Sequence, residues 1–277
     1  MFLRGLAAST FLAATALVAL PAHAQDAVDP PSDLTVSGSV ALVSDYRFRG
    51  VSQTDENMAV QGGITVAHAS GAYVGTWASN LAGWGTFGGA NMELDLFAGY
   101  AVPLGDSGVT LDAGLTWYMY PGGADDTDFA EPYVKLSTDY GPVSALVGVA
   151  YAPKQEALGN FSATPYSRGQ KEDNLYIWTD LSTGIPNSPF TAKAHAGYSN
   201  GNPGLGPNGT SVAPTGEYID WMLGLDAAVG PLTLGVAYTD TNLQYDDYDY
   251  LLPNFSNTED GSNIAGAQVV FSVSAGF

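Results

Sequence analysis

Apolar and polar side chains alternate with a period of two along most of the chain. In one stretch Met92, Leu94 and Leu96 alternate with Glu93 and Asp95. Such alternation predicts β-strands with one apolar and one polar face. About twelve segments of this kind follow one another, each of roughly the ten residues that cross a membrane as a tilted strand. They cover residues 34–46, 58–69, 72–81, 91–103, 108–120, 128–140, 142–152, 174–183, 189–199, 217–230, 231–241 and 266–277.

Two of these segments need separate comment. In 72–81 the lipid-facing parity stays open, because Tyr73 and Trp77 compete with Val74 and Ala78 for the apolar face. In 266–277 the alternation is unbroken and the chain ends on Phe277. A period-two strand with a terminal aromatic residue is typical of outer-membrane β-barrels.

The connections predict the topology. Short turns at 70–71, 104–107, 141, 183–188 and 230–231 alternate with longer connections at 47–57, 82–90, 121–127, 153–173, 200–216 and 242–265. Short periplasmic turns and long extracellular loops alternate in this way in transmembrane, antiparallel, up-and-down β-barrels. We therefore expect an all-β barrel of about twelve strands, with ten or fourteen as the alternatives if a pair has been split or merged.

The N-terminal residues predict export. Arg4 precedes an apolar stretch at 6–20, and Ala22, His23 and Ala24 form a small-residue cleavage site. We expect residues 1–24 to be a signal peptide, 25–33 a flexible periplasmic leader and 34–277 the barrel domain. The apolar stretch is short for a retained transmembrane helix. Together with the barrel strands, this export signal predicts that the protein lies in the outer membrane.

Composition agrees with a barrel. Charged residues make up 13% of the chain, about half the fraction usual for a soluble domain. Asp and Glu number 28 against 8 Lys and Arg, which argues against nucleic-acid binding. Cysteine is absent, as suits an exported chain.

The polar parity of the strands predicts the lining of the barrel interior. We expect the following residues to line a pore: Arg47, Arg49, Glu93, Asp95, Asp112, Lys135, Asp180, Lys193, Asp220 and Asp226. Glu131, Asp139 and His195 share this parity. Carboxylates outnumber bases, and a channel with a negative lining concentrates cations. The predicted pore is therefore mildly cation-preferring.

Two features bear on its bore. Small inward residues, among them Gly63, Gly114 and Gly148, predict open space, whereas Tyr118, Tyr120, Tyr176 and Trp178 predict local narrowing.

Arg47 and Arg49 extend the inward parity of the first strand. We consider two opposing hypotheses for their role. Placed opposite Glu93 and Asp95, they would create a transverse field across a constriction. The plainer alternative is that they pair with neighbouring carboxylates and stabilise the wall.

Aromatic side chains gather near strand ends on the apolar parity, which predicts girdles at the two membrane interfaces. These residues are Tyr46, Tyr100, Trp117, Tyr140, Tyr151, Tyr198, Trp221 and Tyr238.

The stretch from Ser44 to Thr54, with sequence SDYRFRGVSQT, resembles the signature of the TorF family of putative porins. HASG at 68–71 and YVGTWASN at 73–80 continue the likeness, which is strongest over 36–80. The resemblance implies an outer-membrane pore protein of Gram-negative bacteria, and it bears on the fold more than on the solute.

The predicted function is passive diffusion of small hydrophilic solutes. The alternatives are a lipid-modifying enzyme embedded in the barrel, or a non-conducting structural or adhesive barrel. His68 and Ser70 form the best enzymatic constellation, yet we expect no enzyme. Acidic clusters at Asp125, Asp126 and Asp128 and at Asp246, Asp247 and Asp249 match no ordered calcium loop, so no metal and no cofactor is predicted.

The expected partners are outer-membrane lipid and lipopolysaccharide, the barrel-assembly machinery reading the strand that ends on Phe277, and small hydrophilic solutes. No nucleic acid is expected.

Overall fold

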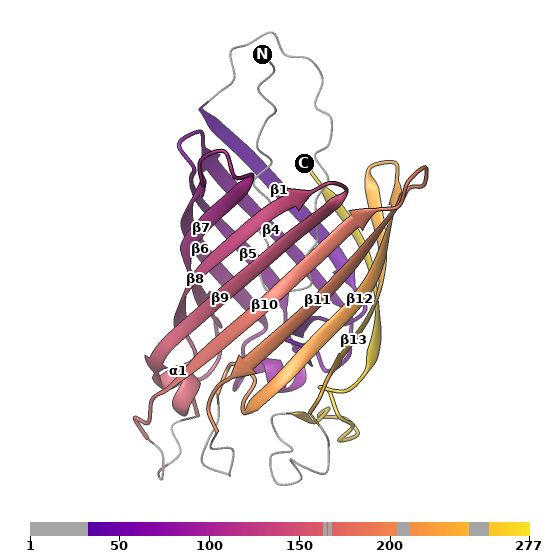
Figure 1. The fold of residues 1–277 in the computed structure, drawn as a ribbon. Helices are drawn as coiled ribbons and strands as arrows, with labels where there is room; N and C mark the ends of the chain where they lie inside the picture. Colours follow the sequence, from indigo (N-terminus) through magenta and orange to yellow (C-terminus); the bar gives the residue numbers. More distant parts are fainter. Residues whose placement is uncertain (1–32, 163–164, 166–167, 204–210, 244–254) are drawn as a thin grey trace.

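The computed structural model describes residues 33–162, 165, 168–203, 211–243 and 255–277. Within these residues twelve strands close an antiparallel barrel in the order β1-β14-β13-β12-β11-β10-β9-β8-β7-β6-β5-β4. Each strand pairs with its neighbours along the chain, and β1 closes on β14. The strands run obliquely to the barrel axis (Figure 1). The predicted fold class is confirmed, while the signal peptide and all but Asp33 of the leader lie outside the described residues.

The barrel strands agree with the predicted segments to within a few residues at each end. Their bounds are β1 Leu34–Val43, β4 Ala59–His68, β5 Ala72–Asn80, β6 Met92–Pro103, β7 Val109–Met119, β8 Phe129–Tyr140, β9 Val143–Gln155, β10 Glu172–Gly184, β11 Phe190–Asn200, β12 Glu217–Val229, β13 Leu232–Thr241 and β14 Gln268–Gly276. The last residue, Phe277, exchanges two backbone hydrogen bonds of 3.0 Å with Gly38 of β1. The terminal strand therefore closes the barrel, as its alternation predicts.

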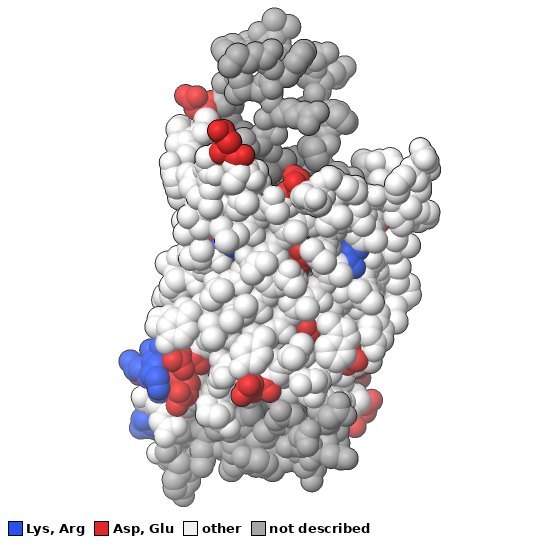
Figure 2. Space-filling model, viewed as in Figure 1, with Lys and Arg blue, Asp and Glu red and all other residues white. Residues whose placement is uncertain are grey.

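The period-two pattern separates an apolar outside from a polar inside. Along β12 the side chains of Ile219 and Leu223 are exposed, whereas Asp220 and Met222 between them are buried. Large apolar side chains cover the outer surface of the strands, and the charged residues visible from outside lie mostly towards the two ends (Figure 2). None of the described helices is long and apolar enough to cross a membrane.

The two ends of the barrel differ, as predicted. The connections β4–β5, β6–β7, β8–β9, β10–β11 and β12–β13 are tight turns, and we call this the short-turn end. The other connections are long, and we call the opposite end the long-loop end. The long loops contain the 3₁₀ helix η1 Gly83–Thr86 and the short helix α1 Glu156–Gly159. The end of β14 lies at the short-turn end (Figure 1).

Three local predictions need correction or completion. The first strand ends at Val43, because the chain turns into the barrel at Ser44 instead of continuing to residue 46. Tyr46 therefore has no exposed surface and belongs to no girdle. In β5 the open question of parity is settled, since Val74 is exposed outside and Tyr73 is buried inside.

The inward glycines do not mark open space. A Cβ atom built at Gly75, Gly99, Gly114 or Gly148 would collide with an aromatic ring on the adjacent strand, and one built at Gly63 would collide with the Thr76 carbonyl oxygen and lie tightly against the Trp77 ring. The rings belong to Trp77, Phe97, Tyr73, Tyr133 and Trp178, each directly opposite its glycine in the strand register. These rings lie over bare backbone, so the expectation of an empty interior at these glycines is wrong.

Candidate functional site: the barrel interior

All ten residues predicted to line a pore lie inside the barrel. Glu93, Asp95, Asp112, Lys135, Asp180, Lys193, Asp220 and Asp226 are on the inward parity of their strands, as expected. Arg47 and Arg49 are inside for a different reason, because they lie on a separate hairpin. That these residues line a conducting pore stays a prediction.

The hairpin is formed by β2 Arg47–Phe48 and β3 Val51–Ser52. We call it the inner hairpin, and residues 44–56, which contain it, the inner segment. Its two-residue turn has positive φ at Arg49, 51°, and at Gly50, 81°. Positive φ at both central residues is typical of the type I′ turn, whose twist matches that of the paired strands. Glycine is required at position 50, because a Cβ there would collide with Thr241 and Asp220.

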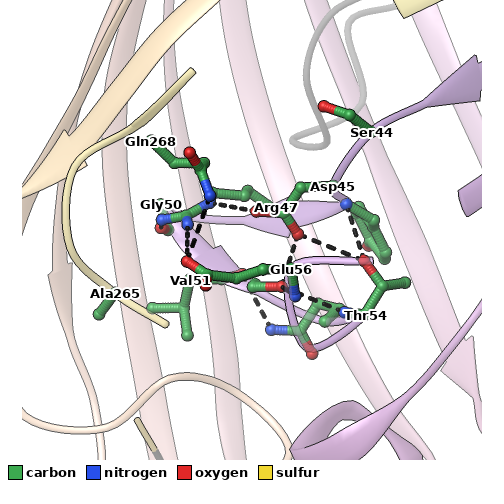
Figure 3. A network of polar contacts seen from close by, with 12 residues as sticks. Ser44, Asp45, Arg47, Gly50, Val51, Thr54, Glu56, Ala265 and Gln268 are labelled. Atoms are coloured by element: carbon green, nitrogen blue, oxygen red, sulfur yellow. Dashed lines mark hydrogen bonds and ion pairs between the residues drawn. The ribbon is translucent and has the colours of Figure 1, made fainter. Parts of the chain in front are cut away.

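Arg47 holds the inner segment together. Its Nε donates to Asp45 at 2.6 Å, and its Nη2 donates to Glu56 at 3.1 Å. Its Nη1 donates to the carbonyl oxygens of Gly50 and Gly266, at 2.9 and 2.7 Å. Figure 3 shows this network around Arg47. The arginine pairs mainly with carboxylates close to it in sequence, as the plainer hypothesis has it.

Arg49 joins opposite sides of the barrel. Going around the barrel in either direction, four strands separate the neighbouring strands β1 and β4 from the neighbouring strands β9 and β10. These two pairs of strands therefore face each other across the interior. From the hairpin that follows β1, Nη2 of Arg49 donates to Glu131 on β8 at 2.5 Å, and Nη1 donates to Asn174 on β10. Its guanidinium lies over the ring of Tyr176, 4.4 Å from the centroid. The inner hairpin therefore spans the interior.

This geometry differs from the facing rows of charge that the transverse-field hypothesis requires. Neither arginine forms an ion pair with Glu93 or Asp95 in the described structure; Arg49 pairs instead with Glu131. The hypothesis assumed that the first strand continues straight, whereas the inward turn at Ser44 carries Arg49 past β6.

Aromatic packing fills the interior around the inner hairpin. Phe48 packs edge-on against Tyr118, which stacks on Phe129 at a centroid distance of 4.4 Å. Tyr46 packs edge-on against Trp77 at 5.3 Å. The predicted narrowing by Tyr118, Tyr120, Tyr176 and Trp178 agrees with their burial, since each is 5% exposed or less. The half of the interior towards the long-loop end is thus largely occupied.

Nearer the short-turn end, charged pairs lie on one wall. Lys135 contacts Asp112 at 2.9 Å, and Lys193 contacts Asp226 at 2.7 Å. Lys193 and Asp226 retain some exposure, with side chains 15% and 13% accessible. The opposite wall, from β13 through β14 and β1 to β4, presents small or hydroxyl side chains such as Ser39 and Ser272 at this level.

His195 is the centre of a network that the sequence does not single out. Its Nδ1 lies 2.6 Å from Asp180, and its Nε2 lies 3.1 Å from Asp220. The Tyr176 hydroxyl also contacts Nε2, at 2.8 Å. The sequence indicates that Asp180 on β10, His195 on β11 and Asp220 on β12 all point inward. Their contacts depend on the register between these strands, which the sequence alone does not give.

Outside the strands, burial shifts several titrating groups of the inner segment. Burial raises the pKa of Tyr46, and the nearby charge of Glu93 raises it further, so the hydroxyl stays protonated. For Arg49 burial alone would lower the pKa, but the charge of Glu131, the hydrogen bond to it and the neighbouring Tyr118 and Tyr176 together outweigh burial, and the pKa rises. Burial also raises the pKa of Glu56, against the opposing effect of Arg47.

Two further sets of residues were considered from the sequence. Among the residues that the structure describes, no group of three or more His, Asp or Glu side chains is arranged to hold a metal ion. The cluster at Asp246, Asp247 and Asp249 lies outside those residues. His68 and Ser70 do meet, with 2.9 Å between Nδ1 and Oγ, but both are exposed at a turn, and Nδ1 also accepts the Ser70 backbone N–H at 3.0 Å.

Solved structures with a similar fold include one described as "Unveiling the Mechanism Behind the in-meso Crystallization of Membrane Proteins". It is 11% identical, the likeness covers 87% of this chain and 83% of that chain, and the TM-score is 0.50. More distant likenesses are an outer membrane channel from Pseudomonas putida F1, 9% identical, covering 91% and 100% with a TM-score of 0.42, and Salmonella typhi OmpF in complex with daunomycin, 11% identical, covering 88% and 97% with a TM-score of 0.42. At such identities the likeness concerns the fold alone.

The sequence matches none of the curated proteins with which it was compared. A family model described as "Bacterial protein of unknown function (Gcw_chp)" matches residues 27–277. The TorF resemblance seen in the first strands stays a prediction. Because the match covers the whole barrel domain, the chain belongs to the Gcw_chp family.

Proposed function

We propose that the protein is an outer-membrane channel for the passive diffusion of small hydrophilic solutes, with a mild preference for cations. The observation that carries this function is the division of the barrel into an apolar outer surface and an interior that gathers its charged side chains. In a bilayer such a barrel satisfies its backbone internally and presents apolar side chains to lipid. We place the short-turn end in the periplasm.

The cation preference is supported by the balance of charge inside. The two buried arginines of the inner hairpin are accompanied by Asp45, Glu56, Glu93, Asp95 and Glu131. Charged side chains near the narrowest part of a channel have the largest effect on ion selectivity. Excess carboxylate at the level of the inner hairpin therefore favours cations over anions.

The inner hairpin sets the expected size of the solute. It crosses the interior at the half that aromatic rings already narrow, so we expect a low conductance and exclusion of large solutes. The wall between β13 and β4 offers the smallest side chains, and we place the path of solutes along it.

The proposed function is tested by single-channel recording of the refolded mature protein in planar bilayers under a KCl gradient. We expect small discrete steps and a reversal potential of the sign that cation preference gives. Heat-modifiable migration in a gel shows independently that the barrel is folded. A folded barrel with an anion-biased reversal potential contradicts the cation preference.

A shortened variant tests the role of the inner hairpin. Gln53 N donates to Tyr46 O at 2.7 Å, so two glycines in place of residues 47–52 join the flanking chain without stretching it. This change is combined with Asp45→Asn and Glu131→Gln, because the loss of Arg47 and Arg49 would otherwise leave both carboxylates buried and unpaired. We expect a higher conductance than in a control that keeps the hairpin and carries the same two substitutions. Equal conductances would show that the hairpin does not restrict the path.

A specific observation favours a second candidate, a non-conducting structural barrel. The residues around the inner hairpin are packed tightly enough that Tyr46 and Phe129 have no exposed surface. This candidate would be supported if the wild type and the shortened variant both fold and neither gives conductance steps. The lipid-enzyme alternative has weaker support, since in the described structure no carboxylate bonds to His68.

A further inference from the structure

Glu93 and Asp95 differ from the other enclosed carboxylates on the inward faces of the described strands. Asp112 and Asp226 pair with lysines, Glu131 pairs with Arg49, and Asp180 and Asp220 both contact His195. No ion pair is formed by Glu93 or Asp95 within the described residues. Two carboxylates, adjacent on one face of β6, thus lie in the interior without a basic partner.

Both side chains are almost completely buried. Glu93 is 2% exposed and accepts a hydrogen bond from the Tyr46 hydroxyl, 3.1 Å from each carboxylate oxygen. Asp95 is 1% exposed, and its Oδ1 accepts no hydrogen bond from any described residue. Arg49 donates its hydrogen bonds to Glu131 and Asn174 and forms none with Glu93 or Asp95. The Asp95 side chain is therefore buried, and its Oδ1 has no partner among the described residues.

A second unpartnered polar group lies in the same wall. Gln61 on β4 is 3% exposed, and its Nε2 makes no hydrogen bond to a described residue. The strand register aligns Gln61 with Ser79, and Ser79 with Glu93. A small serine thus separates the amide from the carboxylate pair. Since the two ends of an amide are assigned from their contacts, an unpartnered amide end can equally present its oxygen.

Buried carboxylates without partners carry a large energetic cost unless a proton or a cation neutralises them. Hard cations prefer oxygen ligands of the kind found here, namely the two carboxylates and the Tyr46 phenol, with the Gln61 amide two strands away on the same wall. With only two carboxylates the site suits a weakly held ion of single charge better than a tightly held divalent metal. A weakly held ion exchanges, as conduction requires.

We propose that Glu93 and Asp95 form a binding site for a small inorganic cation, of the class of Na⁺ and K⁺, enclosed between β6 and the inner segment. The site rests on the proposed channel function for its role, which is to set the cation preference at the narrow level of the interior. Tyr46 holds Glu93 on the side of the inner segment, and Asp95 provides the free carboxylate oxygen.

The site is tested by thermal unfolding of the refolded barrel in KCl, NaCl and choline chloride at one ionic strength. Choline is too large for an enclosed site between neighbouring strands. We expect the wild-type midpoint to be about 5 °C higher in KCl or NaCl than in choline chloride, as a ligand that binds only the folded state raises it. Asp95→Asn and Glu93→Gln, which keep side-chain shape, are expected to lose this difference.

Asp139→Asn is the matched control, because Asp139 is an exposed carboxylate at the short-turn end. It is expected to keep the full difference. Equal wild-type midpoints in all three salts, together with a midpoint that rises as the pH falls, would show that the pair holds protons and would overturn the proposal. A cation effect unchanged in both Asp95→Asn and Glu93→Gln would also overturn it.

Failure of this site and failure of the channel are distinguishable. A conducting barrel with no cation-dependent midpoint refutes the site and leaves the channel. A barrel that gives no steps but is stabilised by K⁺ through Asp95 refutes the channel and leaves the site.

Discussion

Arg49 occupies the tip of the inner hairpin with a φ of 51°, a conformation that side chains other than glycine adopt rarely. Such backbone conformations persist where surrounding contacts determine them. Here those contacts are the ion pair with Glu131, the bond to Asn174 and the bond from the Tyr218 hydroxyl to the Arg49 carbonyl oxygen at 2.9 Å. One residue thus ties the inner hairpin to β8, β10 and β12.

Replacing Arg49 by methionine should destabilise the barrel by about 3–5 kcal/mol, because Glu131 is left buried and unpaired. The double variant Arg49→Met with Glu131→Gln should recover much of this loss, which a double-mutant cycle in urea unfolding measures. Lys154→Met is the control, since the Lys154–Glu172 pair is exposed and should contribute less than about 1 kcal/mol. Equal losses for Arg49→Met and Lys154→Met would contradict the prediction.

At the scale of elements, neighbouring strands interlock through glycine and aromatic side chains. An aromatic ring on one strand covers the glycine directly opposite, as Trp178 on β10 covers Gly148 on β9. The rings pack against the wall from inside and fill the space that each glycine would leave. The strand positions themselves follow from the alternation of the sequence, but this interlocking depends on register, which the sequence alone leaves open.

Gly148→Ala should therefore destabilise the barrel by about 1–3 kcal/mol, because the new methyl group displaces the Trp178 ring. Gly184→Ala is the matched control in β10, since no atom lies within 4 Å of a Cβ at that position and its φ is not positive. Its free energy of unfolding should be unchanged or slightly higher. A loss of the same size at both positions would contradict the proposed role of the ring.

The inner hairpin shows why part of the site could not be predicted. Through Tyr46 and Arg47 the sequence continues the alternation of β1, so a longer first strand is the natural reading. Gly50 was the available signal for a turn, but a turn preceded by arginine lacks the usual Asn-Gly or Asp-Gly pair. The inward parity of Glu93 and Asp95 was readable, whereas their lack of partners depends on where Arg49 goes.

For the whole molecule, the proposed outer-membrane location assigns a partner to the exposed apolar side chains on the outside of the strands, which would face lipid. Leu223 lies in the middle of β12 and is 63% exposed, while Val229 lies at its short-turn end and is 52% exposed. In a bilayer these similar exposures should have different consequences, because the cost of a charge depends on its depth.

Leu223→Arg should reduce the free energy of unfolding from lipid vesicles by about 2–4 kcal/mol, and Val229→Arg by about 0–1 kcal/mol. Urea titrations of the two variants in the same lipid measure the difference. If both substitutions had the same small effect, the middle of β12 would not lie at the centre of a bilayer.

The contacts of the inner segment also impose an order on assembly. Asp55 accepts a backbone hydrogen bond from Thr258 at 2.9 Å, and Ser52 N donates to Ile264 O at 3.0 Å, across more than two hundred residues of chain. These bonds need the connection between β13 and β14 in place, and Arg49 needs β8 and β10. Contacts between residues so distant in sequence form late in folding. The inner hairpin therefore makes its contacts only after the surrounding strands have paired. The barrel wall is then complete before its interior is crossed.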